Sequence, residues 1–169
     1  MISIWNEQLA DCALKIAKYR ENFVATLAPF ARLAHSYLTD NKEELSLEYV
    51  GIKETTTQDI IARLERNLQK DMALGYTSYG IHRDDISVCV NDIDVRTFGS
   101  QGQQRTCALS LKLAELEIIK TQTRSIPVLL LDDVLSELDE DRKIKLLKFC
   151  KKAQTLISCT SFPYDIKCH

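Results

Sequence analysis

The chain has 169 residues, of which 45% are hydrophobic and 27% are charged, so it is long enough to bury a core of its own. Its net charge of −2 and its isoelectric point near 5.9 exclude a nucleic-acid footprint spread over the whole surface, so any DNA contact must be local. The six cysteines show no Cys-x-x-Cys spacing, and the sequence contains neither a signal-peptide pattern nor a long apolar span. We therefore expect a reduced, cytoplasmic protein without a membrane anchor.

The first part of the chain is expected to be mainly helical. Apolar residues at steps of mostly three or four predict a long amphipathic helix that forms half of a helical hairpin or short coiled coil. Its stripe consists of Trp5, Leu9, Cys12, Ile16, Tyr19, Phe23, Leu27 and Phe30. Pro29 is expected to kink or end this helix. Alternation predicts a strand over 45–49, and apolar spacing predicts a returning helix over 57–72 with a threonine cap.

Strand and helix patterns alternate in the second part. Alternation over 86–90, followed by a polar turn, predicts a hairpin. A core face of leucine and isoleucine after Gly102 predicts a long helix that ends near 120–124, where basic residues suit a helix C-terminus. A helix over 137–151 and a strand over 155–159 follow, and that strand is expected to belong to a parallel sheet.

The segment Val128–Asp133 is the most informative part of the sequence. Four apolar residues end in Asp132 and Asp133. This pattern predicts a strand buried on both faces, whose carboxyl end brings charge to a phosphate and metal site. An ordinary strand with a capping Asp is the alternative.

A second informative segment, Phe98–Thr106, opens the long helix with a cluster of Gly, Ser and Gln. The first turn of a helix has unpaired N–H groups and the positive end of the helix dipole, so such a cluster suits an anion. A plain loop with a helix cap is the alternative. The order of the two segments, with a helix of about twenty residues between them, favours a shared nucleotide-handling role.

The histidines give only weak evidence for a metal site. His82 stands beside Asp84 and Asp85, which could form a metal site, but contiguous residues on a strand point to opposite sides. A polar turn before the strand is therefore the favoured interpretation. His35 and His169 have no sequence neighbours that suggest metal binding, so we treat them as ordinary residues.

Three segments together resemble known motifs of ABC-type ATPases. Gly99–Gln103 resembles their signature motif, Val128–Asp133 resembles their Walker B strand, and Ser136–Asp139 resembles the D-loop that follows. This resemblance implies an α/β fold of the P-loop NTPase class, in the form of a partial ABC-ATPase head with a helical arm or coiled-coil insertion.

More narrowly, Gly80–Asp85, Phe98–Thr106 and Leu129–Asp139 resemble the RecF family of bacterial DNA replication and repair proteins. The resemblance covers most of the chain and about the C-terminal half of that family's usual length. It implies a helical arm, or lever, over 1–78 and the C-terminal lobe of the ATPase head over 79–169.

The resemblance also implies an ATP site shared by two protomers, in which one protomer contributes the phosphate loop and Walker B and the other contributes the signature helix. The residues that would face the γ-phosphate in trans are Ser100, Gln101, Gly102 and Gln103.

Further roles follow from the same resemblance. Asp132 would hold Mg²⁺, since hard cations prefer oxygen ligands. Asp133 would occupy the position of a catalytic glutamate and is one methylene shorter, so slow hydrolysis is expected. Ser136 and Asp139 would form the D-loop, with Asp139 sensing the opposite site. Thr160 would stand where many relatives carry a switch histidine.

The phosphate loop itself is missing from the sequence. A Walker A motif needs Gly-x-x-x-x-Gly-Lys-Ser/Thr. Gly75 and Gly80 have the glycine spacing, but Ile81 and His82 stand where Lys and Ser/Thr are required. We therefore expect a fragment that lacks the N-terminal half and binds ATP poorly alone. Residues 161–169 depart from the family pattern and are expected to be an altered tail.

The function implied by the resemblance is ATP-dependent binding to single-stranded or gapped DNA, in recombinational repair and the SOS response. Its implied partners are DNA, a second copy of the protein and recombination mediator proteins; the DNA-binding residues are not predicted. Two alternatives stay open. Asp132 and Asp133 could bind metal directly in a nuclease or topoisomerase-type site, or the chain could be a noncatalytic interaction module.

Overall fold

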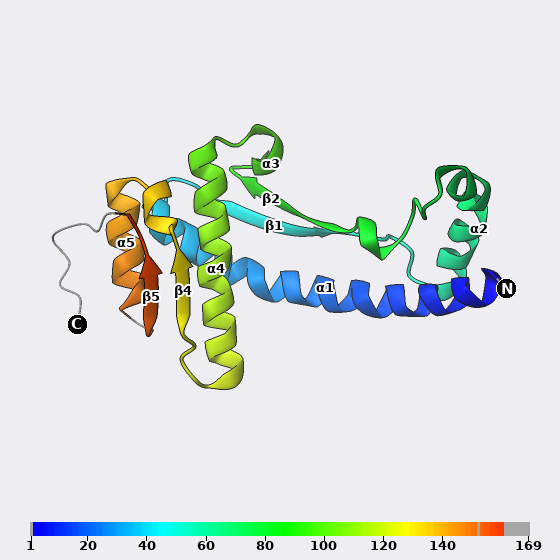
Figure 1. Ribbon diagram of the computed structural model, residues 1–169, viewed down its shortest axis with the longest axis horizontal. Helices are drawn as coiled ribbons and strands as arrows, with labels where there is room; N and C mark the ends of the chain where they lie inside the picture. Colours follow the sequence, from blue (N-terminus) through cyan, green and yellow to red (C-terminus); the bar gives the residue numbers. More distant parts are fainter. Residues whose placement is uncertain (1, 152, 161–169) are drawn as a thin grey trace. The chain divides into compact units, whose positions relative to one another are not determined.

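The computed structural model describes residues 2–151 and 153–160, so the expected altered tail lies outside the described residues (Figure 1). The chain forms two compact units. Unit 1 comprises the residues up to 25 together with 48–87, and unit 2 comprises 26–47 together with the residues from 88 onward. Residues 26–47 thus belong to the second unit, although they lie between the two segments of the first in the sequence.

The elements alternate between helix and strand in the second half of the chain, as the sequence predicts. In chain order they are α1 (Ile2–Thr39), β1 (Leu45–Val50), α2 (Thr57–Leu74), the 3₁₀ helix η1 (Ile81–Arg83), β2 (Asp85–Val90), β3 (Ile93–Asp94), α3 (Val95–Phe98), α4 (Gln101–Thr123), β4 (Leu129–Asp132), the 3₁₀ helix η2 (Val134–Glu137), α5 (Glu140–Cys150) and β5 (Thr155–Ser158). One sheet has the order β1-β2-β3, with β2 and β3 antiparallel, and β4 pairs with β5 in parallel.

Of the two effects expected of Pro29, a kink or an end of the helix, the end does not occur. The helix continues to Thr39. A proline inside a helix removes one N–H donor and usually destabilises it. Here the neighbouring Leu27 and Ala31 are buried in the core of unit 2, so tertiary packing holds the helix together across the proline.

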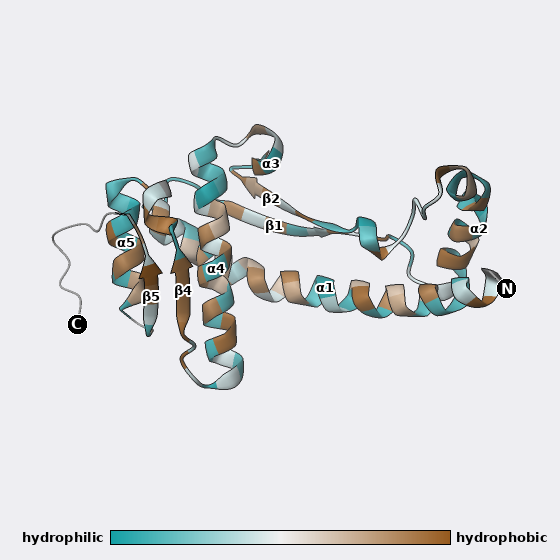
Figure 2. Ribbon diagram, viewed as in Figure 1, coloured by the Kyte–Doolittle hydropathy of each residue, from teal (hydrophilic) through white to brown (hydrophobic). Residues whose placement is uncertain are grey.

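The buried face of α1 in unit 1 is not the expected stripe of large residues. Ala10 and Ala13 are almost completely buried against the core residue Ile60, whereas Trp5 and Tyr19 are 65% and 77% exposed. Apolar residues occur along the whole of α1, so hydropathy alone does not single out one face (Figure 2). Small alanines bring the helix close to its neighbour, which explains why they form the contact.

Helix α2 of unit 1 begins and ends with standard caps. The Thr56 side chain accepts a hydrogen bond from the backbone N–H of Asp59, which is the cap expected near residue 57. Gly75 adopts φ 75° after the last turn and donates its N–H to the Asp71 carbonyl. Glycine suits this left-handed conformation because it has no Cβ.

The polar turn expected before β2 is confirmed as the short helix η1. Asp84 is nearly buried there, with its side chain 3% exposed; it accepts a hydrogen bond from the Tyr49 hydroxyl and lies 3.6 Å from Arg20. Burial, together with the hydrogen bond to Asp84, raises the pKa of Tyr49 to about 12. His82 contacts the Thr77 carbonyl instead of a neighbouring carboxylate. Across the part of the chain that the structure describes, no group of three or more His, Cys, Asp or Glu could hold a metal ion.

Helix α4 lies at the centre of unit 2, between two hydrophobic clusters. Leu113 is fully buried in the first cluster with residues of α1, β4 and α5, and Ala114 is fully buried in the second with residues of α1, β1 and β2. Helix α4 therefore buries more than one side. Its other buried residues are Thr106, Cys107, Leu109, Ser110, Leu116 and Ile118.

The parallel pair β4 and β5 is confirmed, but β4 is not buried on both faces as expected. Leu129 and Leu131 point into the core of unit 2, whereas Leu130 is 70% exposed and its register partner Leu156 is 59% exposed. Successive side chains of a strand point to opposite faces, and only one face of this pair is covered by described residues of the unit.

Two smaller findings concern cysteines and membranes. Every cysteine in the described ranges is a free thiol. Among the helices of those ranges, none has the length and apolar character needed to cross a bilayer.

Replacing Leu113 by Ala should lower the free energy of unfolding by about 2–5 kcal/mol, because it leaves a cavity at a fully buried position. Leu33, on α1 of the same unit, is 67% exposed and provides a matched control. Urea denaturation followed by circular dichroism would measure both variants. Equal losses for Leu113→Ala and Leu33→Ala would contradict the placement of the core.

Candidate nucleotide-binding site

The segment that resembles the signature motif forms a complete capping box at the start of α4. The Ser100 hydroxyl accepts a hydrogen bond from the Gln103 N–H at 3.2 Å, and the Gln103 side-chain oxygen accepts one from the Ser100 N–H at 3.0 Å. Gly99 joins this turn to α3. A Cβ there would lie 2.5 Å from the Val95 carbonyl oxygen, so the end of α3 leaves no room for a side chain at this position.

The first turn of α4 is open to solvent. Ser100, Gln101 and Gly102 are exposed, and the N–H groups of a first turn have no acceptor within their own helix. A Cβ on Gly102 would approach no atom closer than Nη1 of Arg142, at 3.9 Å. Packing within the chain therefore does not require this glycine, and its small size leaves room for an anion at the turn.

The side chain of Gln103 differs from its three neighbours because it is turned towards the protein. Its Nε2 donates to Oε1 of Glu43 at 3.1 Å, while its Oε1 is occupied by Ser100. Both ends of the amide are thus engaged within the chain. Gln103 therefore supports the turn, whose exposed residues are Ser100, Gln101 and Gly102.

His35, which no sequence pattern singles out, lies behind this turn. It is fully buried, with Nδ1 3.1 Å from the Ser110 hydroxyl and Nε2 3.1 Å from Oε2 of Glu43. Burial lowers the pKa of His35, and the positive charge of Arg142 acts in the same direction, while Glu43 opposes them. Ser110 lies 75 residues away in the sequence, so no local pattern could have revealed the contact.

The two expected carboxylates, Asp132 and Asp133, are exposed at the carboxyl end of β4. We call this place the carboxylate edge. Asp132 accepts a hydrogen bond from the hydroxyl of Ser158, its partner on β5, and the N–H of Asp133 donates to the Ser158 carbonyl at 3.1 Å. Asp133 adopts φ 50°, a left-handed conformation that Asp tolerates better than most residues. Oxygen ligands with open solvent access suit Mg²⁺, which commonly binds one or two carboxylates together with water and phosphate.

The segment that resembles a D-loop connects β4 to α5. The Ser136 hydroxyl donates to the Asp133 carbonyl at 2.8 Å. Asp139 caps α5 by accepting from the Arg142 N–H, and it also lies 2.9 Å from the Arg142 guanidinium. This cap explains why α5 begins at Glu140 and not at residue 137 as expected.

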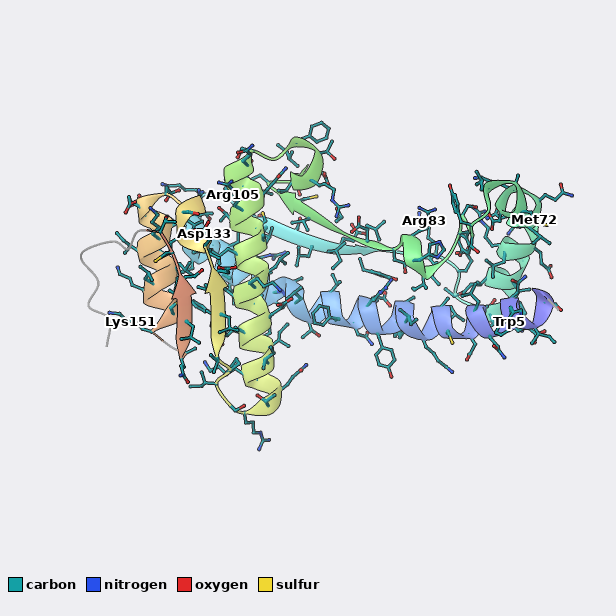
Figure 3. The ribbon with its side chains drawn as sticks, in the orientation of Figure 1. Trp5, Met72, Arg83, Arg105, Asp133 and Lys151 are labelled. Atoms are coloured by element: carbon teal, nitrogen blue, oxygen red, sulfur yellow. The ribbon has the colours of Figure 1, made fainter. Side chains whose placement is uncertain are left out.

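The signature-like turn and the carboxylate edge lie at the same end of unit 2. The chain enters α4 at this end, returns along β4 and reaches Asp133 close to the level of Arg105 (Figures 1 and 3). Arg142 stands near Gly102 and Asp139, so it connects the start of α4 with the start of α5. Thr160, two residues after β5, is exposed. This end of the unit thus combines an exposed helix N-terminus with two exposed carboxylates.

Comparison with known proteins reveals a consistent family. The chain is 42% identical to the DNA replication and repair protein RecF of Ruminiclostridium cellulolyticum and 44% identical to that of Staphylococcus aureus, over 95% of the chain in each case. A solved structure of the recombination mediator protein RecF with ATP superposes with a TM-score of 0.80 and 35% identity over 98% of the chain. The chain belongs to the RecF family. A scan against protein-family models found no match.

The RecF relatives confirm the expected fold class, an α/β head of the ABC-ATPase type with helices and a small sheet. The chain spans 45% and 46% of the length of the two relatives, and 46% of the solved RecF chain.

Protonation of His35 should make stability depend on pH. Because burial lowers its pKa below the usual value near 6.5, the unfolded chain binds this proton more readily. Its contribution is therefore complete well above about pH 6.5 and is lost progressively as the pH falls below that value, with a slope of up to about 1.4 kcal/mol per pH unit.

His35→Gln should flatten that dependence, because it removes the titrating group. Free energies of unfolding measured at several pH values between about 5 and 7.5 would test this. Parallel curves for wild type and His35→Gln would show that His35 does not titrate in that range.

Proposed function

We propose that this chain supplies the signature side of an ATP site that two RecF molecules share. The observation that carries the proposal is the capped but open turn at Ser100–Gly102. The first-turn N–H groups of Gln101 and Gly102 would bind a phosphate group, with Gly102 leaving space for it, and the Ser100 hydroxyl, which here caps the helix, would turn to join them.

The nucleotide would be gripped by a phosphate loop of the other molecule. None of the five glycines of this sequence belongs to a Gly-x-x-x-x-Gly-Lys-Ser/Thr pattern. The turn would therefore contact the γ-phosphate of an ATP molecule already held elsewhere. ATP would then act as a link between two proteins, so that nucleotide binding favours the associated state.

The carboxylate edge would take part in hydrolysis of the bound ATP. Asp132 would hold Mg²⁺, which neutralises phosphate charge when bound, and Asp133 would orient the attacking water. The exposed edge and its oxygen ligands support this assignment. Asp139 already caps α5 and contacts Arg142, so its proposed role as a sensor of the opposite site would require that ion pair to rearrange. Thr160 would take the switch position.

The wider role would be ATP-controlled binding to single-stranded or gapped DNA during recombinational repair, together with recombination mediator proteins in the cytoplasm. The relatives are described as DNA replication and repair proteins, and the solved structures as a recombination mediator in the RecFOR pathway, which supports this role. Unit 1 would serve as the lever arm. The net charge of −2 means that DNA would meet a local surface and not the whole chain.

A metal-dependent nuclease centred on Asp132 and Asp133 is less well supported. It would use the same carboxylates but would leave the capped turn at Ser100 without a function. The described residues also offer no third carboxylate, His or Cys that could join such a metal cluster.

Association in trans can be tested with the complete RecF of Staphylococcus aureus. Sedimentation of that protein with an excess of this chain should show a mixed complex in the presence of ATP. Ser100→Arg should weaken the complex at least about tenfold, because a long side chain fills the space for the γ-phosphate, an effect of about 1.4 kcal/mol or more. Binding of ATP to the complete RecF should be unaffected.

Ser125→Arg provides the control, since Ser125 is exposed beyond the opposite end of α4. A mixed complex that forms equally well with Ser100→Arg, or that forms without ATP, would refute the assignment of the turn.

A further inference from the structure

We propose that Glu43 is a positioning residue for the signature-like turn, and that His35 holds Glu43 in place. The inference deepens the proposed function and rests on it, because it concerns how the turn that faces ATP is kept in its binding geometry. Glu43 lies on the connection between α1 and β1 and would not itself touch the nucleotide.

The two carboxylate oxygens of Glu43 have different partners. Oε1 accepts from the Gln103 side-chain amide and Oε2 lies against Nε2 of His35, both at 3.1 Å. The Glu43 side chain is only 18% exposed. A carboxylate in this environment is a stronger acceptor than it would be in water, so its two contacts are held firmly.

Glu43 determines which way the Gln103 amide points. With the NH₂ group on Glu43, the amide oxygen faces the N–H of Ser100 and closes the capping box. The reversed amide would place its oxygen against a carboxylate and its NH₂ against an N–H donor. Both contacts would be repulsive, so Glu43 selects the orientation that caps the turn.

His35 fixes Glu43 from the protein interior. With its proton on Nε2, the imidazole donates to Glu43, while Nδ1 lies 3.1 Å from the side-chain oxygen of Ser110, whose hydroxyl donates to the Thr106 carbonyl at 2.7 Å. The charged groups that act on this imidazole are Glu43 itself and Arg142. A path of hydrogen bonds therefore runs from α1 through Glu43 and Gln103 to Ser100, the residue proposed to meet the γ-phosphate.

An exchange of the two side-chain types gives a specific test. Gln103→Glu places a second carboxylate against Glu43 and should open the turn. Adding Glu43→Gln should restore it, because the new amide at position 43 can donate to the carboxylate introduced at position 103, which still accepts from the Ser100 N–H. Glu43→Gln alone should be mild, since His35 can change tautomer and accept from the new amide. Glu44→Gln is the matched control, because the Glu44 side chain is 72% exposed.

The first measurement uses this chain alone and needs no nucleotide. Amide hydrogen exchange of Ser100, followed by NMR, should be about tenfold faster in Gln103→Glu than in wild type, as expected for the loss of one hydrogen bond. The double variant should return to within about twofold of wild type. Unchanged exchange in Gln103→Glu, or no recovery in the double variant, would overturn the positioning role.

The second measurement is the ATP-dependent association with complete RecF of Staphylococcus aureus. Gln103→Glu should weaken association about tenfold, with recovery in the double variant and with melting temperatures of all variants compared. If wild type associates and Gln103→Glu associates equally well, the positioning role fails while the proposed function stands. If wild type itself fails to associate, the proposed function fails, and the exchange measurement alone decides whether Glu43 positions the turn.

Discussion

The packing of α4 on both sides is the constraint on which unit 2 depends. One helix supplies Leu113 to one hydrophobic cluster and Ala114 to the other, and both are fully buried. Since the start of α4 is also the signature-like turn, the position of the turn follows from the packing of the core. A shift of α4 would be transmitted directly to Ser100, because the helix is a rigid connection between them.

Buried polar groups restrict the orientation of α4 within this packing. His35, Thr106 and Ser110 are fully buried, and the described residues contain no buried side-chain nitrogen or oxygen without a hydrogen-bond partner. Burying such groups is costly unless they are paired, so a wrong rotation of α4 would leave several of them unsatisfied. Apolar packing therefore brings the helices together, and the contacts of His35 select one arrangement of α4 against α1.

Sequence periodicity predicted the elements of unit 2 well because their signals are local. The helix after Ser100, the parallel pair β4 and β5, and the hairpin all follow from short-range patterns. The buried face of α1 was assigned wrongly because Ala10 and Ala13 carry little hydropathy, while large residues such as Trp5 dominate the pattern. Close helix packing favours small residues, and no scale based on transfer from water expresses that preference.

Only part of the candidate site could likewise be predicted from the sequence. The turn at Ser100 and the carboxylates at Asp132 and Asp133 could be found from the sequence, since each is a contiguous motif with a known chemical use. The support behind the turn could not be found, because Glu43 and Gln103 are separated by 60 residues and neither is unusual where it stands. What the motif residues present to a ligand is visible in sequence, whereas what holds them depends on the tertiary fold.

A crystal structure of this chain with complete RecF of Staphylococcus aureus and ATP would test the central claim most directly. The account predicts that the Ser100 hydroxyl and the Gly102 N–H lie within about 3 Å of γ-phosphate oxygens of a nucleotide held by the other molecule. A complex in which this turn faces solvent while ATP is bound elsewhere would contradict it.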